Sequence, residues 1–71
     1  MAKKAEVDLN QLLALRIKQG YSVSDMATRL GYKTPTGYWL LEKGKRQVSV
    51  DNLYRLAQIY SIPMEDLVQE V

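Results

Sequence analysis

The chain has 71 residues with no cysteine and no histidine, and it carries 10 Lys and Arg against 8 Asp and Glu. This length suffices for one small domain, whose core supplies little more than about 3–5 kcal/mol of stability. Without cysteine there is no disulfide framework or thiolate metal site, and without histidine the commonest general base is missing. We therefore expect no catalytic residue, no metal site and no cofactor, which excludes most classes of enzyme.

Charge divides the chain into two unlike parts. Residues 1–50 hold nine Lys and Arg against four acids, a net +5, whereas residues 51–71 hold one Arg against four acids, a net −3. Such an uneven distribution suits a protein that presents one face to a polyanion. No apolar run approaches the about 20 residues of a membrane span, and the basic start lacks the apolar region of a signal peptide. A soluble, cytoplasmic protein with no membrane partner is expected.

The first predicted elements are a flexible segment over residues 1–7 and a helix that begins after Asp8. Asp8 is a typical N-cap, and Gln11 stands three residues later, as in a capping box. An apolar face that includes Ile17 follows, and Gly20 ends the helix.

Two short helices joined by a tight turn come next. Ser22 opens the first of them with a capping box, and Gly31 ends it as a left-handed stop. The second starts near Thr34-Pro35, a cap residue with proline at the first helical position, and runs to about Lys43 in a basic loop. Such a unit is typical of proteins that lay the second helix in the major groove of duplex DNA.

The last predicted elements are a fourth and a fifth helix. The fourth is capped by Ser49 and has an inner apolar stripe that starts at Val50. Pro63 opens the short fifth helix, which extends to Val68. Because no segment shows the two-residue alternation of a strand, the predicted fold is all-α, with five short helices in one domain over residues 8–71.

Many positions in these helices match the pattern of one known family. They are Leu15-Arg16 with Gly20, Met26-Ala27, Leu30-Gly31, Leu41-Glu42-Lys43-Gly44-Lys45, Ser49, Leu53, Leu56-Ala57, Tyr60 and Met64-Glu65-Asp66-Leu67. In this set the chain resembles the phage-repressor/Cro-like helix-turn-helix family, also called Xre-like, over residues 9–68. The resemblance implies a lambda-repressor-like DNA-binding domain with a central helix-turn-helix and an internal ion pair between Arg16 and Glu42.

Three features depart from the family pattern. The spacing from Leu30 to Glu42 is one residue longer than usual, and Val23 stands where the family often has a phosphate-contacting Gln. The outward face of the third helix also lacks the usual Gln, Asn, Ser or Arg; at about 100° per residue it consists of Thr36, Trp39, Leu40 and Lys43, with Gly37 at its edge. We therefore expect few hydrogen bonds between this helix and the base edges. Recognition is then expected to depend more on the basic groups and on DNA shape.

The resemblance and the basic flanks of the third helix together define a predicted DNA-binding site. Its residues are Lys33, Thr34, Thr36, Gly37, Trp39, Leu40, Lys43, Lys45 and Arg46. The predicted function is a sequence-specific transcriptional regulator that binds double-stranded DNA. We expect it to act as a repressor that occupies an operator, and to be associated with the nucleoid when it is bound.

The sequence leaves the partners of the domain open. The last two helices carry more apolar residues than one inner face needs, namely Tyr54, Ile59, Ile62, Met64, Val68 and Val71. These residues either form a homodimer interface, at least on a palindromic operator, or only close the underside of the core. The alternative function is a protein-interaction module on the same fold, an antagonist or antitoxin-like partner, whose Trp39 and Leu40 face binds a regulatory protein.

Overall fold

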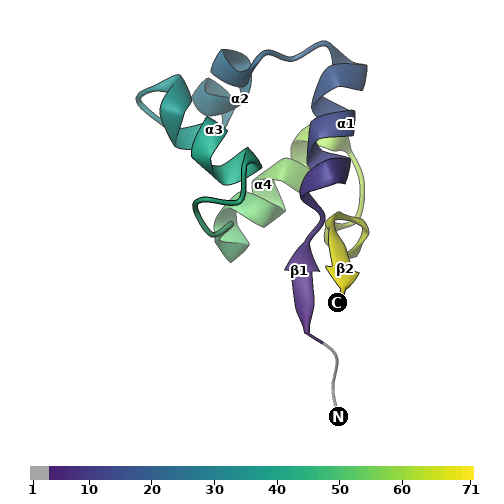
Figure 1. Cartoon of the computed structure of the whole chain (residues 1–71). Helices are drawn as coiled ribbons and strands as arrows, with labels where there is room; N and C mark the ends of the chain where they lie inside the picture. Colours follow the sequence, from purple (N-terminus) through teal and green to yellow (C-terminus); the bar gives the residue numbers. More distant parts are fainter. Residues whose placement is uncertain (1–3) are drawn as a thin grey trace.

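The computed structural model describes residues 4–71, and this part of the chain holds four α-helices, one 3-10 helix and a two-stranded sheet. The elements are β1 Ala5–Val7, α1 Leu9–Gln19, α2 Val23–Arg29, α3 Pro35–Glu42, α4 Val50–Tyr60, the 3-10 helix η1 Met64–Leu67 and β2 Val68–Glu70. Figure 1 shows α2 and α3 at one end of the molecule and the sheet at the other, beside the C-terminus. No helix among the described residues is long and apolar enough to cross a membrane.

The sheet is the main difference from the predicted all-α fold. Ala5–Val7, which the sequence assigns to a flexible segment, pair antiparallel with Val68–Glu70, so that Val7 lies opposite Val68. The bonding continues into α1, because the Asp8 N–H donates to the Leu67 carbonyl at 2.8 Å. These three residues are therefore part of the folded domain, whereas residues 1–3 of the predicted flexible segment lie outside the described residues.

The predicted fifth helix is also different. After Pro63 the chain makes only the 3-10 helix η1, and Val68 leaves it in an extended conformation to begin β2. The fold is thus four α-helices with a short sheet at one end, and the helical character of the prediction holds for the rest of the domain.

Helix starts follow the capping signals read from the sequence. Asp8 accepts a hydrogen bond from the Gln11 N–H at 3.2 Å, Ser22 forms the predicted capping box, and Ser49 caps α4. Thr34 has the extended backbone of an N-cap, but its side chain makes no capping hydrogen bond. Its hydroxyl is thus not engaged at the start of α3.

The core lies where α1, α2, α3, α4 and η1 meet. Its buried apolar residues are Leu12, Met26, Ala27, Leu30, Tyr38, Leu41, Leu56, Ala57, Tyr60 and Leu67. Two residues of the predicted apolar stripes are exposed instead, Val50 and Ile17. Val50 belongs to the first turn of α4, which extends past the core, and Ile17 lies about 140° around α1 from Leu12.

Candidate nucleic-acid interface

The turn between α2 and α3 has a defined hydrogen-bonded geometry. Gly31 adopts φ 81°, and its N–H donates to the Thr28 carbonyl at 3.1 Å, while the Tyr32 N–H donates to the Ala27 carbonyl at 2.8 Å. This pair of bonds is the Schellman arrangement, which needs a left-handed residue at the position of Gly31. It ends α2 and directs the Tyr32 side chain towards α3.

The Tyr32 side chain packs against α3 and fixes the position of this helix. Its ring lies against Gly37, so closely that a Cβ atom added at Gly37 would be 2.6 Å from a ring carbon of Tyr32. On the far side its hydroxyl accepts a hydrogen bond from the Asn52 side-chain amide at 3.0 Å, which links the turn to α4. Glycine inside a helix costs about 1 kcal/mol relative to alanine. Here the missing side chain makes room for an aromatic ring.

The loop after α3 repeats the same ending. The Gly44 N–H donates to the Leu41 carbonyl and the Lys45 N–H donates to the Leu40 carbonyl, with Gly44 at φ 76°. Lys45 is therefore held directly beyond the last turn of α3. The guanidinium of Arg46 lies 5.6 Å from the centre of the Tyr32 ring, in a cation–π contact. The two cations of this loop thus follow the C-terminal end of α3, where Lys45 is placed by its backbone and Arg46 also by its side chain.

An internal ion pair ties α1 to α3, as the resemblance implies. Arg16 Nε donates to Glu42 Oε2 at 2.9 Å and Arg16 Nη2 donates to Glu42 Oε1 at 3.0 Å, a bidentate arrangement. Arg16 Nη1 also donates to the Tyr21 carbonyl at 3.1 Å, before the start of α2. Only 16% of the Arg16 side chain and 4% of the Glu42 side chain are exposed. One arginine therefore fixes both ends of the α2–α3 unit.

Tyr38 lies beside this ion pair. Its hydroxyl is buried and has no hydrogen-bond partner within ordinary geometric limits among the described residues. It still lies near enough to Glu42 for the two groups to influence each other, and burial is the main reason that the pKa of Tyr38 is raised. Burial alone would raise the pKa of Glu42 too, but the hydrogen bonds and positive charge of Arg16, together with the proximity of the Tyr38 hydroxyl, outweigh burial and lower that pKa.

The structure separates the residues of the predicted site by exposure. Lys33, Thr34, Thr36, Trp39, Lys43, Lys45 and Arg46 are exposed, and Leu40 is partly buried. Gly37 is buried with the Tyr32 ring against it, so it offers little surface for a contact with DNA. Among the described residues no carboxylate lies within ion-pair distance of the four cations around α3. Their charge is therefore not neutralised by a partner within that part of the chain.

A comparison of the sequence with family models agrees with this geometry. The model of the family described as Helix-turn-helix matches residues 12–67, which includes α2, the turn, α3 and the loop after it. The chain belongs to the Xre-like helix-turn-helix family. No curated protein and no solved structure shows significant similarity to it.

Family membership gives the general role of this helix-turn-helix protein. It is a DNA-binding transcription regulator of the Xre type, and the family is one of regulators rather than a class of enzymes. Within the family motif, the outward face of α3 is exposed. Lys33 precedes this helix, and Lys43, Lys45 and Arg46 follow it.

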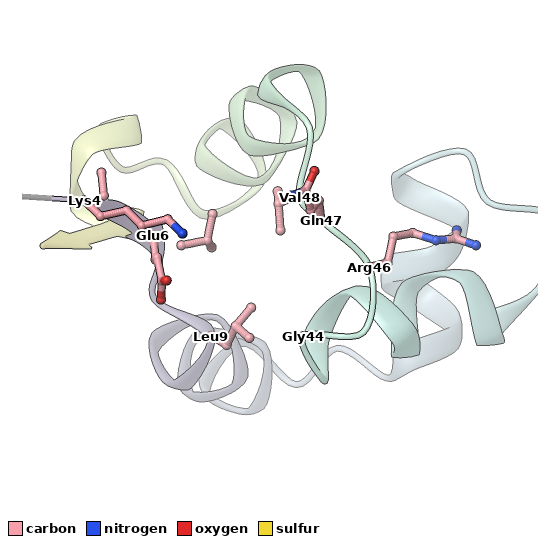
Figure 2. A pocket seen from close by; sticks show the side chains of 9 residues that line it. Lys4, Glu6, Leu9, Gly44, Arg46, Gln47 and Val48 are labelled. Carbon is pink, nitrogen blue, oxygen red and sulfur yellow. The ribbon is translucent and has the colours of Figure 1, made fainter. Parts of the chain in front are cut away.

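A shallow hollow of about 420 Å³ lies beside the loop that follows α3 in this helix-turn-helix protein. Figure 2 shows Lys4 and Glu6 on the strand side and Gly44 and Val48 on the loop side, while the Arg46 guanidinium points away from the hollow. The hollow is open, and opposite charges line its strand side. It does not gather the buried polar groups that fix a small ligand.

Tyr32 and Asn52 were not predicted as residues of the site. Neither faces outward from α3, so the helical pattern that identified Trp39 and Leu40 does not include them. Two signals in the sequence point to this contact: a glycine at Gly37 in the middle of α3, and an aromatic residue in a turn that is one residue longer than the family pattern. A helical glycine of this kind often marks a close approach by another group.

Because the folded pKa of Glu42 lies below its ordinary value of 4.5, we predict a loss of stability in acid. The unfolded chain binds the proton first as the pH falls, so the ion pair contributes fully above about pH 4.5 and is lost below it. Urea unfolding from about pH 6 to about pH 3 measures this. The free-energy difference between the parent and Glu42→Gln should be largest near neutral pH and shrink in acid. A difference that does not change with pH would contradict the prediction.

Proposed function

We propose that the protein represses transcription by occupying an operator in duplex DNA, with α3 in the major groove and α2 across the backbone. The observation that supports this most is the set of cations around the exposed face of α3, which are Lys33, Lys43, Lys45 and Arg46. Lys and Arg side chains are common partners of DNA phosphates, and phosphate contacts fix the register of a protein on the duplex. Bound in this way, the regulator blocks its site by occupancy.

Two copies are proposed to bind a palindromic operator. Half-sites one helical turn apart place two recognition helices about 34–36 Å from each other. Tyr54 and Val71 remain largely exposed and are available for contact between copies, whereas Ile59, Ile62 and Met64 pack partly against the core. The proposed homodimer therefore forms at least on DNA, and its contact area is smaller than the apolar content of the sequence suggests.

A second candidate function rests on the apolar character of the α3 face. Trp39 is 42% exposed and Leu40 lies next to it, a pair that could bind a protein surface. In that case the domain would act as an antagonist or antitoxin-like partner of a regulatory protein. The four surrounding cations favour DNA over this alternative, because an apolar protein groove offers them no counter-charge.

A salt series tests the proposed function. Binding to duplex DNA should weaken steeply as salt rises, because each phosphate contact releases counterions. Replacing two phosphate-contacting residues together, Lys45→Ala with Arg46→Ala, should reduce the slope of log affinity against log salt by about two units. The charge-matched control, Lys18→Ala with Arg55→Ala on α1 and α4, should leave the slope nearly unchanged. No affinity for duplex DNA even at about 50 mM salt would contradict the proposal and favour the protein-interaction alternative.

A further inference from the structure

The outward face of α3 is unusually poor in hydrogen-bonding groups. Of the residues from Pro35 to Glu42, only Pro35, Thr36 and Trp39 are exposed, and Leu40 is partly so. The Thr36 hydroxyl and the Trp39 indole N–H are the only side-chain hydrogen-bonding groups on this face. The single charged residue of the helix, Glu42, is buried and engaged by Arg16.

This composition excludes the strongest forms of base recognition from the helix itself. Bidentate contact with guanine requires Arg or Lys, and bidentate contact with adenine requires Asn or Gln. None of these residue types occurs within α3. Among groups on the major-groove edges of the four bases, the C5-methyl group of thymine is the one that apolar side chains recognise.

We propose that α3 recognises its operator chiefly through thymine methyl groups, which contact Leu40, Trp39 and the methyl group of Thr36. This inference rests on the proposed function, in which α3 enters the major groove. Lys43, exposed directly after the helix, contributes charge at the end of this surface. The cations around α3 match the phosphates outside the groove, and the apolar face of α3 matches the row of C5-methyl groups that a run of thymines presents within it.

The fixed position of α3 within the domain makes this recognition of methyl groups specific. Tyr32 against Gly37 and Arg16 on Glu42 hold the helix at its first and last turns. A methyl group is recognised only when an apolar atom meets it closely, because the attraction between two carbon atoms falls off within a fraction of an ångström. A helix fixed to its own domain keeps Thr36, Trp39 and Leu40 in one register relative to the loop cations.

The test changes one methyl group at a time on the DNA. A binding site is first selected from a random duplex pool, and each thymine is then replaced by uracil, which removes the C5-methyl group and keeps the pairing. Fluorescence of the single tryptophan, Trp39, reports binding directly. We expect uracil to weaken binding about fourfold for each methyl group that α3 contacts. Methylation of cytosine at C5 in a cytosine variant of the site should restore part of the affinity.

Two protein variants identify the side chains. In Leu40→Ala, uracil at the position facing Leu40 should no longer weaken binding. Thr36→Ser removes only a methyl group at an exposed position, so it keeps the fold and should abolish the uracil effect at its own position. If the protein binds duplex DNA with the expected salt dependence but no uracil substitution changes affinity, the inference is wrong and the proposed function stands. If no duplex binds at low salt, both are wrong.

Discussion

Replacing Arg16 with methionine should lower the free energy of unfolding by about 3 kcal/mol. The change leaves the Glu42 carboxylate, only 4% exposed, without its hydrogen bonds from Arg16, of which the two shortest measure 2.9 and 3.0 Å. We take the lower end of the range for a broken buried pair because solvent still reaches part of Arg16. A domain of this length has a total stability of roughly 4–10 kcal/mol. The variant should therefore lose roughly a third to three quarters of the stability of the domain.

Urea unfolding followed by Trp39 fluorescence measures the effect of Arg16→Met. The control is the double variant Arg16→Met with Glu42→Leu, which removes the buried charge together with its partner. Replacing both members of a buried ion pair with apolar residues is often neutral or stabilising. The double variant should thus regain much of the lost stability. A loss below about 1 kcal/mol for Arg16→Met would show that the pair behaves as an exposed salt bridge.

The second large effect is expected at Gly37 and depends on Tyr32. Alanine inside a helix is favoured over glycine by about 1 kcal/mol, yet its Cβ would meet the Tyr32 ring at 2.6 Å. Overpacking of this kind costs about 1–3 kcal/mol, and the ring cannot yield freely because Asn52 and Arg46 hold its far side. The gain in helix propensity offsets part of this cost, so Gly37→Ala should destabilise the protein by up to about 2 kcal/mol.

In a Tyr32→Ala background the sign of this effect should reverse. The ring is gone, the clash is absent, and Gly37→Ala should then stabilise the protein by about 1 kcal/mol through helix propensity alone. Thermal or urea unfolding of the four proteins in this double-mutant cycle measures the coupling. A Gly37→Ala variant that is more stable than the parent would mean that Tyr32 does not seat α3. Tyr32→Phe, which keeps the ring, should retain the parent's response to Gly37→Ala.

Local signals explain which parts of the fold were predictable. The boundaries of a helix depend on residues within one turn of each end, so they are visible in the sequence. This holds for the helix starts at Asp8, Ser22 and Ser49 and for the helix ends at Gly31 and Gly44. The β1–β2 pairing is not local, because it joins three residues near each end of the domain. Strands this short carry too few alternating positions to be recognised, and a mutual partner is what stabilises them.

In the predicted DNA-binding site, too, some features follow from the sequence and others depend on contacts that the sequence does not reveal. The outward position of Thr36 and Trp39 follows from helical geometry alone, and the Arg16–Glu42 pair follows from the family resemblance. The Tyr32–Gly37 contact depends on how closely the turn brings an aromatic ring to α3, which neither periodicity nor charge reports. For this reason Gly37 was assigned to the DNA-binding surface, whereas the structure buries it beneath Tyr32.

The face made by α3 and the loop after it should be the surface of the protein that binds duplex DNA. Nuclear magnetic resonance titration of the isotope-labelled protein with the selected operator duplex tests this most directly, because every backbone amide reports separately. We predict that the shifts concentrate in α3 and residues 43–47, with smaller ones at the start of α2, and that they vanish at high salt. The absence of any shift at low salt, or shifts confined to α4 and the β1–β2 sheet, would show that duplex DNA does not bind at this face.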